Sequence, residues 1–539
     1  MDGAPVSERE EDATRPIGPS RPLPPPPEPP GRSRRHFPAA LGLTVLGALV
    51  PGTAFLAAGR RRLGAVTLLG FLLLVAGVVW LAGPGRRTAA RIAVDSTSLT
   101  WVLAGVVVVA LLWTVVVVAG YRVLVPPRTS RGQHLVGAVV VLALLAGLAV
   151  PAATVVGAAL AQRGLLAALF GDHESATVVD RPDPFGDKAR VNVLLLGGDG
   201  GEGREGVRTD TVIVASIDTD TGDTTLFSLP RNLEDLPFPP GSPLAEVYPD
   251  GFDAGSESES LLNAVYRNGP GMYPDILGPT DDPGADFLKL GVGEALGLTI
   301  DYYVLVNLDG FARLVDALGG ITVNVNYYVP VNGDPGTGEL PDDYIAPGPH
   351  QHLDGYLALQ FARGRYGLTD YDRMARQRCT IAAIIDAADP VTLLRKYQQL
   401  AATTQDIVRT DVPRSALDDF VDLGFLVKDA EVRSVVFDTS VIDPAYPDYA
   451  EMRAIVSEAI APAADGAATT PAADHAAATT PAADHAAATT PAAAPAVPSG
   501  QTPAPATTTP IADVGDACAY DPALAQAALA AGEPPNKAG

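Results

Sequence analysis

Four apolar segments near the N-terminus of this 539-residue chain constrain its fold more than any other feature of the sequence. They span residues 38–59, 63–83, 98–120 and 134–161. Each approaches or exceeds the roughly 20 residues that a helix needs to cross a bilayer. Several such segments in a row differ from a cleavable signal peptide, whose apolar part is shorter. The sequence therefore predicts a multi-pass membrane region over residues 38–161, embedded in a lipid bilayer.

The first of these segments differs from the others because Pro51 and Gly52 lie at its centre. Proline disrupts a helix interior, so we expect residues 38–59 to form a broken or re-entrant hairpin that returns to the cytoplasm. Three crossings then place the N-terminus inside and the C-terminal part outside. This topology leaves Arg86, Arg87 and Arg91 on the outer face, against the positive-inside rule. Four plain crossings with an external N-terminus are the alternative.

Charge is divided between the two ends of the chain. Through Arg163 there are 16 Arg and no Lys against 7 acidic residues, a net charge of +9. The whole chain carries −24, so the remainder carries −33. So acidic a remainder repels phosphate backbones, which argues against nucleic acid as a partner.

The two ends of the chain have the composition of unstructured segments. Residues 1–37 contain a Pro run and few apolar residues, which predicts a disordered cytoplasmic tail. Residues 461–539 are rich in Ala, Thr and Pro, and they repeat PAADHAAATT at 471–480 and 481–490. Proline in each copy prevents a continuous helix, so we expect an extended tether over 461–539. The chemistry is therefore expected in a domain over residues 176–460.

The two cysteines, Cys379 and Cys518, both lie in the part that we place outside, where a disulfide can persist. A single pairing is possible, and it would attach the end of the chain to the domain. Two free thiols are the alternative.

A glycine-rich stretch follows the first apolar run of this domain. Residues 191–196 (VNVLLL) precede GGDGGEG at 197–203, which contains the pattern G-x-G-x-x-G. On its own this pattern suggests a dinucleotide-binding turn. Such a turn must open a helix, whereas residues 211–217 (TVIVASI) are typical of a strand. A dinucleotide site is therefore rejected.

Residues 211–217 and 224–229 predict two strands joined by the turn-rich segment 218–223, and thus an antiparallel hairpin. The start of the first strand and the end of the second lie at the same end of a sheet, which brings Arg208 and Asp210 beside Arg231. Asp199 joins them if the strand over 191–196 neighbours the hairpin. Two carboxylates and two guanidinium groups then share one edge.

Further strands and helices alternate along the chain, which indicates an α/β sandwich. Strands are expected over 303–307 and 321–325, on either side of a helix over 310–318 that Asp309 caps and Gly319 ends.

Two arginine-bearing helices follow. Helices are expected over 355–363, capped by Asp354, and over 371–388, capped by Asp370. On the second helix Arg373, Arg376 and Gln377 lie three and four residues apart and share one face. Five arginines fall between residues 363 and 378 in an otherwise acidic domain. A solvated charged face is the alternative explanation for them.

Together, these residue types point to one substrate chemistry. The guanidinium group of an arginine can donate two parallel hydrogen bonds to the oxygens of one phosphate. Several arginines are needed where two linked phosphates carry the charge. Asp199 and Asp210 offer hard oxygen ligands suited to Mg²⁺, which proteins commonly hold by one or two carboxylates plus substrate phosphates. The sequence therefore predicts a pyrophosphate site with Mg²⁺ as cofactor and phosphoryl transfer as its reaction.

Five segments of this region resemble the LytR-CpsA-Psr family, in the same order and at similar spacing. They are VNVLLLGGDG, VRTDTVIVASID, TLFSLPR, LDGYLALQFARGR and TDYDRMARQR. The resemblance covers about residues 185–460 and implies a membrane-anchored extracellular α/β domain with a mixed central β-sheet flanked by helices. It implies transfer of a glycopolymer, such as teichoic acid, arabinogalactan or capsule, from a polyprenyl-pyrophosphate carrier to peptidoglycan. Polyprenyl phosphate would be released, with pyrophosphatase activity as a side reaction.

The resemblance also implies residue roles. Asp199 and Asp210 would bind Mg²⁺, and Asp370 would be the base, with Arg231 and Arg373 as its catalytic partners. The pyrophosphate would be held by Arg208, Arg231, Arg363, Arg365, Arg373 and Gln377. The family usually has Asp where this chain has Asn232, which puts a metal or proton-transfer role at that position in doubt. The lipid of such a substrate needs an apolar slot, and the apolar runs 303–306 and 381–385 are candidates for it, with core packing as the alternative use of these residues.

Three other functions stay open at this stage. The protein could bind lipid-linked precursors without catalysis, or transfer the same glycan to a surface protein. A role in transcription is disfavoured, because it requires DNA contact from a part of the chain with a net charge of −33 that we place outside the membrane.

Overall fold

The protein was analysed as a computed structural model, which describes residues 36–170, 174–178, 181, 183–198, 207–388, 408–461 and 511–537. It divides into two compact units. One comprises Met1–Leu72 and Leu111–Leu148, and the other Leu73–Ala110 and Ala149–Gly539. The decapeptide repeats, Asp199 and most of the predicted N-terminal tail lie outside the described residues.

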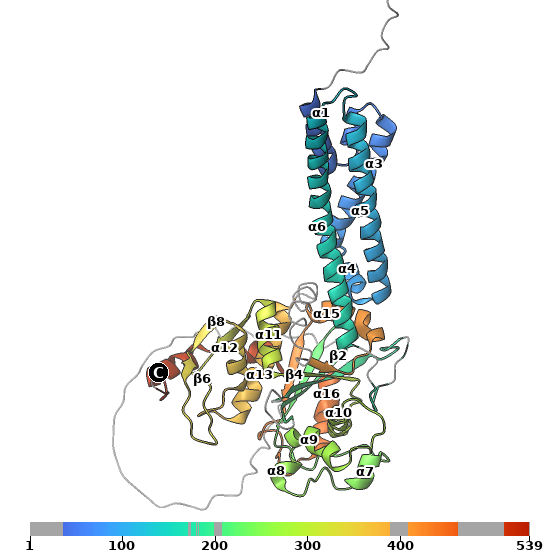
Figure 1. The fold of residues 1–539 in the computed structure, drawn as a ribbon. Helices are drawn as coiled ribbons and strands as arrows, with labels where there is room; N and C mark the ends of the chain where they lie inside the picture. Colours follow the sequence, from blue (N-terminus) through green and yellow to red (C-terminus); the bar gives the residue numbers. More distant parts are fainter. Residues whose placement is uncertain are drawn as a thin grey trace, which may run out of the picture. The chain divides into compact units, whose positions relative to one another are not determined.

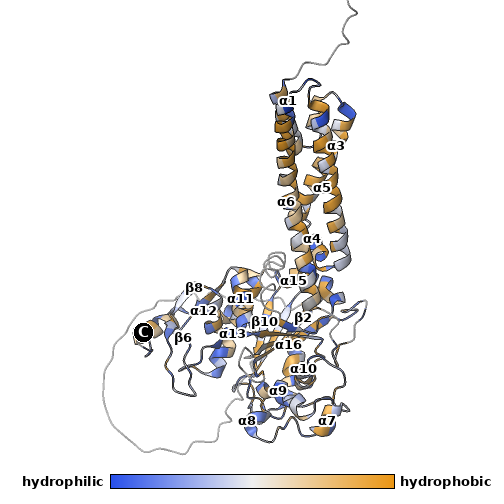
Figure 2. Ribbon diagram, viewed as in Figure 1, coloured by the Kyte–Doolittle hydropathy of each residue, from blue (hydrophilic) through white to orange (hydrophobic). Residues whose placement is uncertain are grey.

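Three helices in the described part of the chain are long and apolar enough to cross a membrane (Figure 2). They are α3 (Arg61–Ala82), α5 (Ser96–Leu124) and α6 (Arg131–Leu169). The segment 38–59 instead forms two short helices, α1 (Phe37–Leu49) and α2 (Thr53–Ala57). Gly52 separates them with a φ of 102°, a left-handed conformation that favours glycine. The helix breaks where Pro51 and Gly52 predict it, and a re-entrant path through the bilayer stays a prediction.

A short helix between α3 and α5 carries the arginines that the three-crossing topology leaves outside. This helix is α4 (Arg86–Val94), and Arg91 forms an ion pair with Asp422 on α15 (Leu417–Val427). The guanidinium of Arg87 lies 5.4 Å from the ring centroid of Phe425 on the same helix. Both α4 and α15 belong to the second unit, so these arginines have partners within the acidic domain.

The acidic domain is built on a seven-stranded mixed sheet with the order β11-β10-β3-β2-β1-β4-β9 (Figure 1). Its strands are β1 (Arg190–Gly198), β2 (Thr209–Asp218), β3 (Thr224–Leu229), β4 (Tyr302–Asn307), β9 (Val408–Thr410), β10 (Val432–Val436) and β11 (Ile511–Asp513). β2 and β3 form the expected antiparallel hairpin, and β1 runs antiparallel beside β2 with Gly197 opposite Thr211. β4 and β10 are parallel to β1 and β3, respectively. The predicted fold class, a mixed sheet flanked by helices, is confirmed.

Apolar residues alternate along the central strands and cover both faces of this sheet. Leu194 and Leu196 of β1 belong to the main core, whereas Val191 and Val193 pack in a second cluster with Leu417 of α15. The main core is completed by helices that include α7 (Pro243–Val247), α9 (Leu262–Met272), α10 (Pro283–Leu296) and α16 (Tyr449–Ile460). The short helices α8 (Glu257–Ser260) and η1 (Arg414–Ala416) connect these elements. The sheet is therefore a rigid platform for residues at its strand ends.

A smaller subdomain follows β4. It contains α11 (Leu308–Leu318), α12 (Gly355–Arg363), α13 (Asp370–Ala387) and two two-stranded sheets. The sheets pair β5 (Ile321–Val325) with β8 (Gly348–Leu353), and β6 (Val329–Val331) with β7 (Asp343–Ile345). These elements share a core of their own, which includes Val315, Ile321, Val323 and Phe361. The expected strand over 321–325 is therefore present, but outside the main sheet.

Two of the expected helix caps in this subdomain can be compared directly with the structure. Asp354 caps α12, since its Oδ1 accepts a hydrogen bond of 2.9 Å from the Leu357 amide. The prediction for α11 was wrong: Asn307, not Asp309, is the N-cap, and its side chain accepts from the Gly310 amide at 2.7 Å. Asp309 instead lies in the first turn, where a negative charge favours the positive end of the helix dipole.

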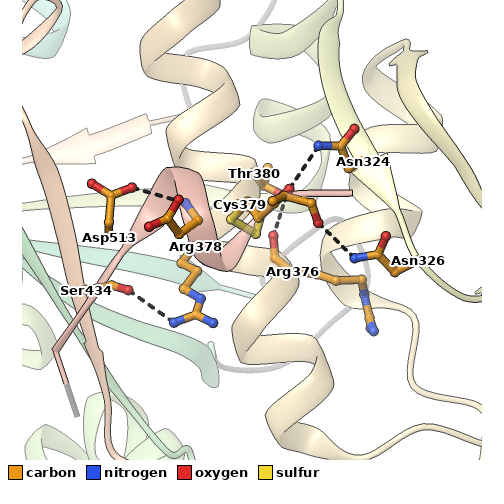
Figure 3. Close-up of a disulfide and its surroundings, with 11 residues drawn as sticks. Asn324, Asn326, Arg376, Arg378, Cys379, Thr380, Ser434 and Asp513 are labelled. Atoms are coloured by element: carbon orange, nitrogen blue, oxygen red, sulfur yellow. Dashed lines mark hydrogen bonds between the residues drawn. A yellow bond between two sulfur atoms is a disulfide. The ribbon is translucent and has the colours of Figure 1, made fainter. Parts of the chain in front are cut away.

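The last described segment, 511–537, packs against the domain instead of forming the expected tether (Figure 3). β11 pairs with β10, and it continues into α17 (Val514–Ala517), which precedes a disulfide between Cys518 and Cys379 of α13. The side chains of Asn324 and Asn326 donate to the carbonyls of Cys518 and Ala519 at 3.0 and 3.1 Å. The chain then forms α18 (Pro522–Ala531). The tether prediction is corrected for this segment, because β10 offers a strand edge and Cys379 a covalent partner.

Breaking this disulfide is expected to destabilise the domain. It links residues 139 positions apart, and closing so long a loop stabilises a fold by about 3–5 kcal/mol in the chain-entropy account. Scanning calorimetry of the full-length protein should show a lower unfolding midpoint with reductant. The Cys379→Ser/Cys518→Ser variant should have the same unfolding midpoint as the reduced protein, and reductant should not change that midpoint. An unchanged midpoint in both experiments would contradict the prediction.

Candidate functional site

The N-terminus of α13 presents Asp370 to the site instead of using it as a cap. Thr369 is the N-cap, and it forms a capping box with Asp372: the Thr369 hydroxyl accepts from the Asp372 amide, and the Asp372 carboxylate accepts from the Thr369 amide. The prediction that Asp370 caps this helix was therefore wrong. Because Asp370 is not needed at the cap, its carboxylate is available to the arginines around it.

Three guanidinium groups converge on the carboxylate of Asp370. Arg373 Nη2 lies 3.0 Å from Asp370 Oδ1, Arg231 Nε lies 3.6 Å away, and Arg365 Nη1 lies 3.7 Å away. These residues come from α13, from the end of β3 and from the turn after α12, respectively. Three positive charges around one negative charge leave a local excess that favours an additional anion.

Asp210, near the start of β2, connects this cluster to the edge of the sheet. Its Oδ1 accepts hydrogen bonds from Arg231 Nη1 at 2.9 Å and from Asn263 Nδ2 at 3.1 Å, and its carbonyl accepts from Arg373 Nη2 at 3.0 Å. Burial opposes ionisation of Asp210, but hydrogen bonds and charge from Arg231, Asn263 and Arg373 outweigh it and lower its pKa. This carboxylate is therefore ionised at neutral pH.

Arg373 is the most deeply buried of the clustered arginines, with 3% of its side chain exposed. Burial lowers its pKa, although Asp370 and Asp210 oppose that shift. Its Nε has no hydrogen-bond partner among the residues that the structure describes. A buried, unpartnered donor is costly, so an oxygen of a bound anion would stabilise this position.

The other predicted site residues differ in their placement. Gln377 donates to the Thr211 hydroxyl at 2.7 Å, which attaches α13 to β2 beside Asp210. Arg208 forms an ion pair with Glu259 of α8 at 2.6 Å, and the side chain of Arg363, the last residue of α12, is exposed. The structure thus brings Asp210, Arg231, Arg365, Asp370, Arg373 and Gln377 together. Asn232, which follows Arg231, is exposed.

The two remaining arginines of α13 have structural roles. Arg376 is buried and donates to the Phe361 carbonyl at 2.7 Å, to the Tyr327 hydroxyl at 2.9 Å and to the Gly364 carbonyl. Arg378 donates to the Ser434 hydroxyl of β10 at 3.1 Å. Arg376 therefore fixes the turn that carries Arg365, and it does not share the functional face that the sequence suggested.

Three polar residues around the site were missed by the sequence analysis. Asn263 of α9 holds Asp210, and its backbone amide donates to the Arg231 carbonyl at 3.0 Å. Glu259 binds both Arg208 and Arg267. Asn263 and Arg267 are four residues apart on one helix, a spacing that could have drawn attention to this face.

Core packing, the alternative use weighed for the two apolar runs, is what the structure shows for their described side chains. Tyr303 and Leu305 belong to the main core, while Ile381 and Ile384 pack in two other clusters. Within the described residues, these side chains serve core packing.

Of the two expected Mg²⁺ ligands, Asp210 is described and Asp199 lies outside the described residues. Both hydrogen bonds that Asp210 accepts from described side chains go to Oδ1. An ionised carboxylate with its second oxygen uncommitted by these bonds suits a hard cation held partly by substrate phosphates. The donor chemistry therefore fits Mg²⁺, although the described residues contain no group of three or more acidic, His or Cys side chains that could hold a metal.

Asn263→Ala is expected to lower the affinity for pyrophosphate about tenfold, because Asp210 and Arg231 lose the contact that orients them. Isothermal titration with inorganic pyrophosphate measures this effect. Asn536→Ala is the control away from the site, since Asn536 contacts Glu533 in the last described segment instead. Equal affinities for the Asn263 variant and the unmodified protein would show that Asn263 has no orienting role.

Fold and site together define a mixed-sheet α/β domain with an arginine-lined anion site, in a chain that also has apolar helices long enough to span a membrane. The chain belongs to the LytR-CpsA-Psr family: the LytR_cpsA_psr family model matches residues 170–443, about half of the chain.

Sequence similarity to two named proteins agrees with membership of this family. The chain is 28% identical over 240 residues to biofilm regulatory protein A of Streptococcus mutans, a match that covers 43% of this chain and 53% of that protein. It is 30% identical over 233 residues to the polyisoprenyl-teichoic acid--peptidoglycan teichoic acid transferase TagU of Enterococcus faecalis. This match covers 42% of this chain and 63% of that protein. The chain thus spans less than two thirds of the length of both relatives.

Solved structures that match parts of this chain include TagV of Bacillus subtilis, at 23% identity and a TM-score of 0.34, covering 50% of this chain and 97% of that one. The structure of TagT bound to LIIa-WTA matches at 20% identity and a TM-score of 0.33, and the match covers 53% of this chain and 95% of that one.

Proposed function

We propose that this protein transfers a glycopolymer from a polyprenyl-pyrophosphate carrier to peptidoglycan and releases polyprenyl phosphate. The observation that carries the proposal is the convergence of Arg231, Arg365 and Arg373 on Asp370, beside Asp210. Several guanidinium groups at one place suit two linked phosphates. The name of the E. faecalis relative, which specifies a polyisoprenyl-teichoic acid donor and a peptidoglycan acceptor, makes teichoic acid the first polymer to test.

In the proposed reaction, a peptidoglycan hydroxyl attacks the phosphorus that bears the glycan. A new P–O bond forms to the acceptor, and the P–O bond to polyprenyl phosphate breaks. Arg231, Arg365 and Arg373 stabilise the charge that develops on the leaving phosphate. Once these arginines turn towards the pyrophosphate, the Asp370 carboxylate is released from them and accepts the proton of the attacking hydroxyl. Arg208, Arg363 and Gln377 are proposed as additional pyrophosphate ligands.

Asp210, together with Asp199, is proposed to hold Mg²⁺, which supplies charge neutralisation at the phosphates when it is bound. The lowered pKa of Asp210 keeps this ligand ionised across the physiological range. Pyrophosphatase activity follows as a side reaction if water replaces the acceptor hydroxyl.

The proposed location of this domain is the outer face of the cell membrane. The ion pair between Arg91 and Asp422 agrees with crossings by both α5 and α6, because α4 and the acidic domain then lie on one side of the bilayer. With α3, α5 and α6 as three crossings, the N-terminus lies on the opposite, cytoplasmic side. Protease digestion of sealed, right-side-out vesicles should remove the acidic domain and spare an N-terminal tag.

A transfer assay tests the function directly. Full-length protein in nanodiscs would be mixed with a defined polyprenyl-pyrophosphate glycan, labelled in the sugar, and with peptidoglycan. We expect release of polyprenyl phosphate, label in peptidoglycan, and loss of both when EDTA removes Mg²⁺. Donor binding without release would identify a non-catalytic binder, and label in a protein would identify a protein acceptor.

A further inference from the structure

A cavity of about 470 Å³ lies beside the loop that follows Arg231, and the mechanism above does not use it. Its walls come from the loop around α7, which connects β3 to α9, and from the segment that enters α16. The volume falls within the range of about 300–1,000 Å³ that is typical of small-molecule sites.

Aromatic rings and carboxylates line this cavity. The lining residues include Tyr248, Tyr446 and Tyr449 together with Asp235 and Asp250. Tyr248 is 5% exposed and packs in the main core, so Tyr446 and the partly buried Tyr449 are the rings available to a ligand. Tyr446 is 83% exposed, so its ring is accessible to a ligand. Flat rings offer apolar faces to a sugar ring, while carboxylates accept hydrogen bonds from its hydroxyl groups.

The cavity is formed in advance by a constrained backbone. Asp235 adopts a positive φ of 51°, which is rare for a residue other than glycine and is associated with functional sites. Gly251, with a φ of 105°, packs so closely on it that a Cβ atom would lie 2.4 Å from the Asp235 carbonyl oxygen. The Tyr449 hydroxyl donates to the Glu234 carbonyl at 2.5 Å, and the Phe252 amide donates to the Leu236 carbonyl at 2.9 Å. These contacts hold the walls in place before a ligand binds.

The cavity lies close to the arginine cluster along the chain. Asp235 lies four positions after Arg231, so their Cα atoms lie at most about 14 Å apart, at roughly 3.5 Å per extended residue. The intervening backbone is fixed, since the Glu234 amide donates to the Pro444 carbonyl at 3.0 Å and the Leu262 amide donates to the Leu233 carbonyl at 2.9 Å. An oligosaccharide in the cavity therefore places its next units near the reacting phosphate.

Charge and size together select the class of ligand. Burial and the neighbouring acids Glu257, Asp235 and Asp443 raise the pKa of Glu234, which shows how negative this surface is. Such a surface repels a phosphate-rich polymer, so the donor glycan is disfavoured. A single ammonium group is attracted, but it fills only a small part of a cavity of about 470 Å³. A glycan without phosphate fits both the charge and the volume.

We infer that this cavity, lined by Tyr248, Tyr446, Tyr449, Asp235 and Asp250, binds the glycan strand of the acceptor during transfer. This inference rests on the proposed function, since it assigns the acceptor subsite of the same reaction. The arginine cluster then holds the anionic donor, and the cavity beside the loop after Arg231 holds the polyhydroxylated acceptor.

Binding of a defined peptidoglycan tetrasaccharide of alternating N-acetylglucosamine and N-acetylmuramic acid tests this inference without any catalysis. Its lactyl carboxyl groups are capped as amides in place of the stem peptides, so that the probe carries no negative charge. Isothermal titration of the full-length protein in nanodiscs should show that Tyr446→Ala weakens binding about tenfold. Tyr446→Phe, which keeps the ring, should bind within about twofold of the unmodified protein. Tyr356→Ala is the matched control, because Tyr356 is also exposed but accepts a hydrogen bond from Asn332 in the smaller subdomain.

Transfer kinetics provide the second readout. Tyr446→Ala should raise the KM for the tetrasaccharide acceptor about tenfold with little change in kcat. Unchanged binding and an unchanged KM would overturn the inference, as would tighter binding of the stem peptide than of the tetrasaccharide. If the unmodified protein binds the tetrasaccharide in a Tyr446-dependent way but never releases polyprenyl phosphate, the proposed function fails and the glycan site stands.

Discussion

Arg373→Ala is expected to lower the rate of polyprenyl phosphate release by at least about a hundredfold. Arg373 is buried, touches both Asp370 and the carbonyl of Asp210, and keeps an unpartnered Nε among the described residues. Removing one preorganised donor to developing charge typically costs about 10²–10³ in rate. The initial rate of release from a synthetic donor, at saturating acceptor, measures the loss.

Two further variants separate catalysis from folding. Arg373→Lys keeps the positive charge but loses the paired donors of the guanidinium group. Its rate should therefore lie between that of Arg373→Ala and that of the unmodified protein. Arg453→Ala removes a half-buried arginine of α16 whose hydrogen bond and ion pair among the described residues both go to Glu294, and it should leave the rate unchanged. If Arg373→Ala retains its fold and transfers glycan at the full rate, the arginine cluster is not the catalytic site.

Lys289→Met is expected to destabilise the acidic domain by about 3–5 kcal/mol. Lys289 and Asp411 form an ion pair with 1% and 5% of their side chains exposed, and Lys289 Nζ also donates to the Asp301 carbonyl at 2.9 Å. Removing one partner of a buried pair leaves the other charge uncompensated, which costs this much. Calorimetry should detect a fall of several degrees or more in the unfolding midpoint. Tryptophan fluorescence is unsuitable, because Trp80, Trp101 and Trp113 all lie in the apolar helices.

The loss of unfolding free energy caused by Lys289→Met should also depend on pH. Burial already raises the pKa of Asp411, although Lys289 opposes the shift, so removing Lys289 raises it further. A carboxyl group with a raised pKa in the folded state makes the unfolding free energy fall as the pH rises above its unfolded value of about 3.9. The variant should therefore lose more stability at pH 7 than at pH 4.5. Lys428→Met, at an exposed position, should show no such trend, and a pH-independent deficit would rule out an uncompensated Asp411.

Local features of the fold were predictable from the sequence because their causes are local. Two runs rich in β-branched and apolar residues flank the turn-rich segment 218–223. The β2–β3 hairpin therefore follows from a few neighbouring residues. The same holds for Asp354 at the start of α12. The cap of α13 was misassigned, although Thr369 and Asp372 carry the capping-box spacing in the sequence.

Features that depend on distant residues were not predictable in this way. The hairpin pattern predicted Arg231 beside Asp210, but Arg365 and Arg373 were joined to them only through their residue type and the family resemblance. Asn263 was missed because its contact with Asp210 joins residues 53 positions apart. The packing of residues 511–537 was missed because a composition rich in Ala and Pro does not reveal that β10 has room for a partner strand.

The position of β11 has a consequence for the order in which the protein matures. Cys379 is synthesised 139 residues before Cys518, on the order of ten seconds earlier at ordinary rates of translation. Until Cys518 emerges, β10 is an edge strand with unpaired backbone groups, and such edges promote aggregation. The acidic domain is therefore complete only when the ribosome has finished the chain and the thiols have reached an oxidising compartment. A premature stop between residues 461 and 511 would leave every residue of the arginine cluster in place and still yield a protein prone to misassembly.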